Sequence, residues 1–198
     1  MSVKAKQIGI MGGTFDPIHC GHLLAAEQAR EQARLDEVWF MPARIPPHKE
    51  RAGITAQEHR LRMVELAVAD HPSFRVTDVE LLREGPSYTY DTMCQLIDTY
   101  PDCQFSFIIG GDMVEMLPKW YRISDLIQMV RFIGLARPGS NFDPSAVSSS
   151  VTFVEMPTWE LSSTLVRERA AAGRSLRYLV PAAVESYIRE QGLYESIG

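Results

Sequence analysis

His19 and His22 lie three residues apart and closely follow Gly12 and Gly13 in the stretch GIMGGTFDPIHCGH, which begins at Gly9. Backbone N–H groups in a glycine-rich turn before a helix can hold phosphate, because they are unpaired and the helix dipole favours negative charge. Two histidines at this spacing on a starting helix can face the same side. The stretch therefore predicts a phosphate site in which one anion contacts both imidazoles.

This stretch differs from the two best-known phosphate loops, since it contains neither GxxxxGK followed by Ser or Thr nor GxGxxG. Taken singly, each histidine could have a structural role, and a Gly-Gly pair is usually a turn. A zinc site is a further alternative, because histidine is the commonest metal ligand. However, the sequence has no HExxH pattern and no third ligand at suitable spacing. We expect no metal held by protein side chains.

A second group of polar residues follows Leu161 in the stretch LSSTLVRE. Ser162, Ser163 and Thr164 stand at an expected helix start, where any of them could be a simple N-cap. Three hydroxyls followed by Arg167 also suit phosphate, which accepts strong hydrogen bonds from a guanidinium. We interpret the group as a second phosphate-binding element.

The elements that must position these groups alternate between strand and helix. Apolar runs predict strands, and amphipathic or alanine-rich runs predict helices between them. The expected strands are 7–11, 37–42, 104–109 and 131–137, and the expected helices include 22–33, 163–172 and 181–191. This alternation indicates an α/β fold, a Rossmann-like doubly wound parallel sheet with helices on both faces and further helices at the C-terminal end. Ligands should then bind beyond the carboxyl ends of the strands.

Other segments are less regular. Thr55 and Glu58 have capping-box spacing and predict a helix start there. The run FRVTDVEL, from Phe74, predicts extended segments, and 138–150 is rich in Pro, Ser and Gly, as in a surface loop. We find no internal repeat and expect one domain over residues 1–198.

Composition limits the classes of function. The chain has 198 residues with a formal net charge of -5, which argues against a broad nucleic-acid surface. Three cysteines form no CxxC pair and suggest reduced thiols. No apolar run approaches the about 20 residues that span a bilayer, and the first residues lack a signal-peptide core. We therefore expect a cytoplasmic protein without membrane or nucleic-acid partners.

The two phosphate elements resemble those of a known superfamily. GTFDPIHCGH resembles the HxGH signature of nucleotidyltransferases, and LSSTLVRE resembles their (I/L)SSTxxR motif. The resemblance extends over nearly the whole chain, through the stretches MPARIPPHK, REGPSYTYDT, FIIGGDM and LPKWY to the ending LVPAAVESYIREQGLY. Together they resemble bacterial nicotinate-nucleotide adenylyltransferases. The resemblance implies that ATP and nicotinate mononucleotide become nicotinate adenine dinucleotide and pyrophosphate, with Mg2+, in NAD biosynthesis.

The resemblance also implies roles for individual residues. His19, His22 and Arg167 would be catalytic and contact the ATP phosphates. The remaining ATP or phosphate contacts would be Gly12, Gly13, Thr14, Arg44, His48, Lys49, Gly110, Asp112, Ser163 and Thr164. Tyr88, Thr89, Trp120 and Tyr121 would bind the nicotinate nucleotide, with Trp120 stacked on the pyridine ring and Thr89 near its carboxylate. For Trp120 ordinary core packing is an alternative, and for Asp112 a helix cap.

Several alternatives stay open at this point. The acceptor could be nicotinamide mononucleotide or phosphopantetheine, although phosphopantetheine would not explain PSYT and PKWY. A noncatalytic nucleotide-binding module could keep the same motifs. A class I aminoacyl-tRNA synthetase is opposed by the chain length, the acidic balance and the missing KMSKS-like element. The sequence leaves the oligomeric state open, including a homo-oligomer.

Overall fold

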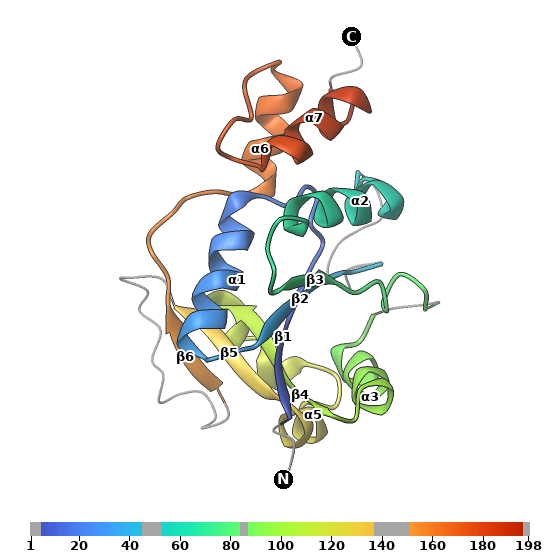
Figure 1. Ribbon diagram of the computed structural model, residues 1–198, viewed down its shortest axis with the longest axis vertical. Helices are drawn as coiled ribbons and strands as arrows, with labels where there is room; N and C mark the ends of the chain where they lie inside the picture. The colour runs from blue at the N-terminus through green and yellow to red at the C-terminus, as the bar shows by residue number, and fades with distance from the viewer. Residues whose placement is uncertain (1–4, 45–52, 84–86, 137–150, 196–198) are drawn as a thin grey trace.

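The computed structural model describes residues 5–44, 53–83, 87–136 and 151–195. His48 and Lys49, two of the expected phosphate contacts, lie outside these residues. The centre of the molecule is a sheet of six parallel strands with the order β3-β2-β1-β4-β5-β6 (Figure 1). The strands are β1 (Lys6–Gly13), β2 (Glu37–Pro42), β3 (Phe74–Val76), β4 (Cys103–Gly110), β5 (Arg131–Ala136) and β6 (Val151–Glu155).

This order confirms the predicted doubly wound sheet. The chain builds outward from β1 to β3 and then returns to place β4 on the other side of β1. The direction of winding reverses between β1 and β4, where such sheets leave a crevice for ligands. The sequence did not predict β6, and the expected extended segments after Phe74 contain only one short strand.

The helices occupy both sides of the sheet and its C-terminal end. They are α1 (Cys20–Gln32), α2 (Gln57–Val68), α3 (Thr89–Thr99), α4 (Gly111–Val114), α5 (Ile123–Met129), α6 (Ser163–Ala171) and α7 (Ala182–Glu190), with a 3-10 turn η1 (Leu117–Lys119). The predicted helices 22–33, 163–172 and 181–191 are confirmed within two residues at each end. Within the described ranges, no helix is long and apolar enough to cross a membrane.

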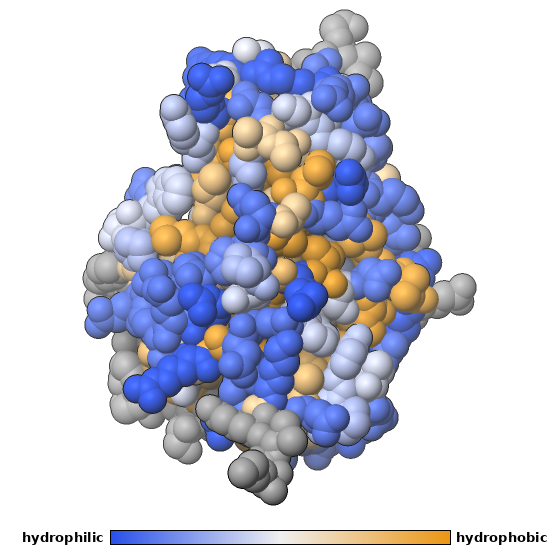
Figure 2. Space-filling view, in the orientation of Figure 1, coloured by the Kyte–Doolittle hydropathy of each residue, from blue (hydrophilic) through white to orange (hydrophobic). Residues whose placement is uncertain are grey.

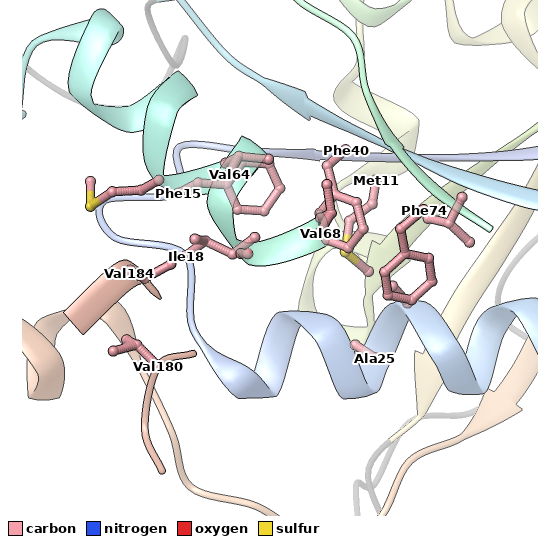
Figure 3. Packing of buried hydrophobic residues seen from close by; sticks show 14 of the residues in the cluster. Met11, Phe15, Ile18, Ala25, Phe40, Val64, Val68, Phe74, Val180 and Val184 are labelled. Carbon is pink, nitrogen blue, oxygen red and sulfur yellow. The ribbon is translucent and has the colours of Figure 1, made fainter. Parts of the chain in front are cut away.

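Alternating side chains of the strands form two separate cores. Ile8 and Ile10 of β1 pack with Met93 of α3 on one face, while Met11 packs with α1 and α2 on the other. In Figure 3, Met11 and Phe40 lie over Ala25 of α1. Both faces of β1 are thus buried, as a central parallel strand requires.

The C-terminal helices α6 and α7 lie beyond one end of the sheet, and α7 packs against α2 (Figure 1). In the same orientation, Figure 2 shows apolar surface in the middle of the molecule and mostly polar surface over α6 and α7. The inner side of this helical pair is apolar. Ile18, in the loop between β1 and α1, lies toward Val180 and Val184 (Figure 3). The C-terminal segment therefore packs directly on the loop that carries the predicted phosphate site.

One local prediction is wrong. Thr55 does not cap α2, because the helix begins at Gln57 after Ala56 and has no side-chain cap. Instead the Thr55 N–H donates to a carboxylate oxygen of Asp16 at 3.2 Å. A tertiary partner has replaced the local hydrogen bond that the capping-box spacing suggested.

Candidate active site

A cavity of about 890 Å³ opens at the carboxyl ends of β1 and β4. Gly12 and Gly13 at the end of β1 form part of its wall, and Ile109 and Gly110 at the end of β4 form another part. The cavity therefore lies where the winding of the sheet reverses, the usual ligand site of such folds.

Most of the residues predicted from the sequence line this cavity. They are Gly12, Gly13, Thr14, His19, His22, Tyr88, Thr89, Gly110, Trp120, Tyr121, Ser163, Thr164 and Arg167. Arg44 is not among the described lining residues, and its guanidinium donates to the Arg83 carbonyl oxygen at 2.7 Å. Asp112 lies in α4, but its side chain is outside the described part of the structure. Lining the cavity does not test a residue's role, so the roles of all the predicted site residues, including His48 and Lys49, stay predictions.

The two histidines form one unit at the start of α1. Their rings stack with centroids 3.7 Å apart, and the His19 backbone N–H donates to His22 Nδ1 at 3.2 Å. A neutral His22 whose Nδ1 accepts must carry its proton on Nε2. Burial lowers the pKa of His19 to about 4, and burial together with His19 lowers the pKa of His22 well below its ordinary value. Without ligand, both rings are neutral hydrogen-bonding groups at pH 7.

Two glycines of the motif are required by close approach. A Cβ atom at Gly13 would lie 2.8 Å from the Phe15 ring, and one at Gly21 would lie 3.0 Å from His19 Nδ1. Real side chains essentially never show the first distance, and the second is tighter than most Cβ contacts. The glycine inside HCGH is thus explained by the position of the His19 ring.

The second motif binds to the first. Ser162 caps α6 by accepting from the Leu165 N–H at 3.2 Å, so the simple capping role falls on this serine. The Ser163 hydroxyl donates to the Pro17 carbonyl oxygen at 2.9 Å, and Arg167 donates to that of Asp16 at 2.6 Å. The two motifs therefore hold each other on one side of the cavity.

Arg167 keeps its charge available. Among the described residues its guanidinium contacts the Asp16 carbonyl oxygen and the Thr164 hydroxyl, at 2.6 and 3.3 Å, and no ion pair to a carboxylate is found there. A guanidinium held by neutral acceptors beside a cavity suits an incoming phosphate, because its positive charge is not neutralised by a protein partner.

The other end of the cavity is aromatic. Trp120 packs edge-on against Phe107 and Phe132, with centroids 5.9 and 6.1 Å away, so it has both the core packing and the cavity position considered from the sequence. Thr89 is the first residue of α3, and the preceding Tyr88 makes no side-chain cap. The first N–H groups of this 11-residue helix therefore offer donors to an anion.

The lining residues to which sequence reasoning gave no individual role include Glu80, Lys119 and Trp159. Burial raises the pKa of Glu80, whose carboxyl group accepts from the Thr92 hydroxyl at 2.9 Å. Lys119 precedes Trp120, and Trp159 lies two residues before the second motif, so adjacency to recognised motifs was the available signal. No such signal marks Glu80, since only the tertiary fold brings it to the cavity.

The described residues contain no group of three or more His, Cys, Asp or Glu side chains arranged to hold a metal ion. The side chains at the phosphate end are hydroxyls, imidazoles and a guanidinium. Guanidinium and neutral N–H groups bind anions rather than Mg2+, which prefers oxygen ligands. The described side chains at this end of the cavity therefore suit phosphate better than a directly held Mg2+.

Comparisons with known proteins agree with this geometry. The family model described as Cytidylyltransferase-like matches residues 10–169. A probable nicotinate-nucleotide adenylyltransferase of Oceanobacillus iheyensis is 53% identical over 189 residues, covering 96% of this chain and 97% of the relative. The nicotinate-nucleotide adenylyltransferase of Bacillus subtilis is 49% identical, covering 96% and 100%.

A solved structure shares the fold at lower identity. The nicotinic acid mononucleotide adenylyltransferase of Plasmodium falciparum, complexed with NaAD, superimposes with a TM-score of 0.80 at 22% identity, covering 96% of this chain and 97% of that one. The sheet order, the cavity with its two motifs and the full-length relatives lead to one conclusion: the chain belongs to the nicotinate-nucleotide adenylyltransferase family, within the cytidylyltransferase-like nucleotidyltransferases.

Proposed function

We propose that this protein transfers the adenylyl group of ATP to the phosphate of nicotinate mononucleotide, giving nicotinate adenine dinucleotide and pyrophosphate, a step of NAD biosynthesis. The observation that carries the proposal is that one continuous cavity joins the two phosphate motifs to the aromatic end at Trp120 and Thr89. Membership of the adenylyltransferase family supports the same reaction.

The reaction needs little acid–base chemistry. A phosphate oxygen of the acceptor attacks the α-phosphorus of ATP, a new P–O bond forms, and the bond between the α-phosphorus and the bridging oxygen breaks to release pyrophosphate. A phosphate monoester has a second pKa near about 6 and is largely dianionic at neutral pH, so no general base is required. Catalysis then depends on alignment and on stabilising charge at the phosphates.

The phosphate end of the cavity is suited to this task. Gly12, Gly13 and Thr14 are assigned to lie against substrate phosphates, and His22 Nε2–H and Arg167 are assigned to charge that develops on the α-phosphate and the leaving pyrophosphate. Because these donors are fixed before the substrate arrives, little reorganisation is needed during reaction. His19 stacks on His22 and adds a second imidazole to the same phosphate oxygens.

The other end of the cavity is assigned to the pyridine nucleotide. Trp120 and Tyr121 offer ring faces, and the first N–H groups of α3 favour the carboxylate of nicotinate over a neutral carboxamide. Mg2+ enters with ATP and supplies neutralisation of phosphate charge when bound, while Ser163 and Thr164 approach the triphosphate from α6. The protein acts in the cytoplasm, which suits three cysteines that are all unpaired.

The test is pyrophosphate release from ATP and Mg2+, with nicotinate mononucleotide, nicotinamide mononucleotide and phosphopantetheine compared at equal concentration. We expect release to be fastest with nicotinate mononucleotide and to fall by about 10² to 10³ in His22→Ala. Selective activity with another acceptor would contradict the assignment of Thr89 and Trp120 to the binding of nicotinate mononucleotide. Folded protein that binds ATP but releases no pyrophosphate with any acceptor would indicate a binding module.

A further inference from the structure

A buried polar network lies beneath the phosphate loop, outside the cavity itself. It centres on Asp16, between the glycines and the histidines, whose carboxylate accepts from the Tyr194 hydroxyl at 2.7 Å and from the Thr55 N–H at 3.2 Å. Asp16 is buried and does not line the cavity, so these contacts are separate from the substrate-binding surface.

Arg60 supplies the second part of this network. Its side chain is only 1% exposed, although it is charged, and it donates to four carbonyl oxygens. These belong to Thr14 (2.7 Å), Ala43 (2.8 Å), Thr55 (3.0 Å) and Arg44 (3.3 Å). Charged groups are rarely buried without partners, and here every hydrogen bond goes to backbone. One guanidinium thus fixes Thr14 of the phosphate loop relative to the chain on both sides of residues 45–52.

The C-terminal segment holds the same loop at further points. Leu179 accepts from the Cys20 N–H at 2.8 Å, where α1 begins, and Ile18 packs toward Val180 and Val184 (Figure 3). Burial raises the pKa of Tyr194, so its hydroxyl remains the donor to Asp16 at neutral pH. The loop between Thr14 and Cys20 is therefore held by α2 and by residues near the end of the chain.

We propose that Arg60 and Tyr194 are positioning residues, which act through Thr14 and Asp16 to keep the phosphate-loop amides and the two histidines aligned on ATP. The inference rests on the proposed adenylyl transfer. Neither residue touches the reacting atoms, and each acts by holding a backbone or carboxylate group three or five residues from His19. Displacement of a catalytic group by about 1 Å can cost about a hundredfold in rate.

The chain provides a matched control for Tyr194. Tyr187, in α7, is also half-buried, and its hydroxyl lies 2.9 Å from His59 Nδ1 of α2; among the described residues this hydroxyl makes no hydrogen bond to the phosphate loop. Tyr194→Phe and Tyr187→Phe therefore each remove one hydroxyl from the C-terminal segment. Only Tyr194→Phe should disturb the loop.

The experiment measures kcat, the KM for ATP and for nicotinate mononucleotide, the ATP dissociation constant and Tm for both variants. The kinetic and binding assays are run at a temperature well below the Tm of each protein. For Tyr194→Phe we expect kcat to fall by about tenfold with the KM for nicotinate mononucleotide unchanged, because the aromatic end lies outside the network. Tyr187→Phe should keep the wild-type kcat while losing a similar amount of Tm. Equal kcat in the two variants, or a Tyr194→Phe change confined to Tm, would overturn the inference.

A second pair tests Arg60. Lysine keeps the charge but cannot reach four carbonyl oxygens, so Arg60→Lys should lower kcat more than Tyr194→Phe does. Arg62 is on the exposed side of α2, so Arg62→Lys should leave kcat unchanged. If the wild type shows no adenylyl transfer, the proposed function fails. The inference is then decided by ATP affinity alone, which must weaken in Tyr194→Phe and not in Tyr187→Phe.

Discussion

Substituting Gly21 by alanine tests how narrowly the His19 ring must be placed. The new Cβ atom would lie 3.0 Å from His19 Nδ1 and 3.1 Å from Cε1, where ordinary contact begins at 3.4 Å. The ring must therefore shift by a few tenths of an ångström. It cannot do so alone, because it is 6% exposed and stacks on His22 at 3.7 Å. The substitution thus displaces both imidazoles.

We expect Gly21→Ala to lower kcat by about 10 to 100-fold, equivalent to about 1.4 to 2.7 kcal/mol of transition-state stabilisation. Stability should change little, because alanine favours a helix over glycine by about 1 kcal/mol and offsets part of the steric strain. Pyrophosphate release and thermal unfolding measure the two effects, with the neighbouring Cys20→Ala as a control of near wild-type rate. Wild-type kcat in folded Gly21→Ala would refute the requirement for a fixed His19 ring.

Three further predictions concern the same site. The folded-state pKa of His19 is about 4, and its value in the unfolded chain is about 6.5, so the unfolded chain binds more protons between these two pH values. The free energy of unfolding should therefore fall by up to about 3 kcal/mol as the pH drops through this window. Urea denaturation measures this fall, which should be smaller in His19→Gln. Ser162→Ala removes the α6 cap and should cost about 1 kcal/mol of stability with the KM for ATP nearly unchanged, whereas a large loss of ATP binding would give this serine a phosphate role. Trp120→Phe should raise the KM for nicotinate mononucleotide several-fold and leave that for ATP unchanged; equal changes in both would assign Trp120 to core packing alone.

Much of the fold follows from local signals. Apolar runs, helix periodicity and the glycines at the end of β1 predicted the central strands and the main helices, because these patterns act over a few residues. The two phosphate motifs were recognised for the same reason, since each is a short segment at the start of one helix. The edge strand β6 was missed, as it is short and its pairing with β5 is decided by the rest of the sheet.

The sequence alone therefore determined the alternating α/β pattern and the two groups of residues that we predict to bind phosphate. The tertiary structure decided how those groups are held. Ser163 donates to Pro17 and Arg167 donates to Asp16, across 146 and 151 positions of sequence. The Thr55 N–H donates to the Asp16 carboxylate, and Thr55 does not cap α2. Burial, likewise a property of the folded chain, keeps both histidines neutral. These features depend on which distant segments meet, and no local pattern encodes that.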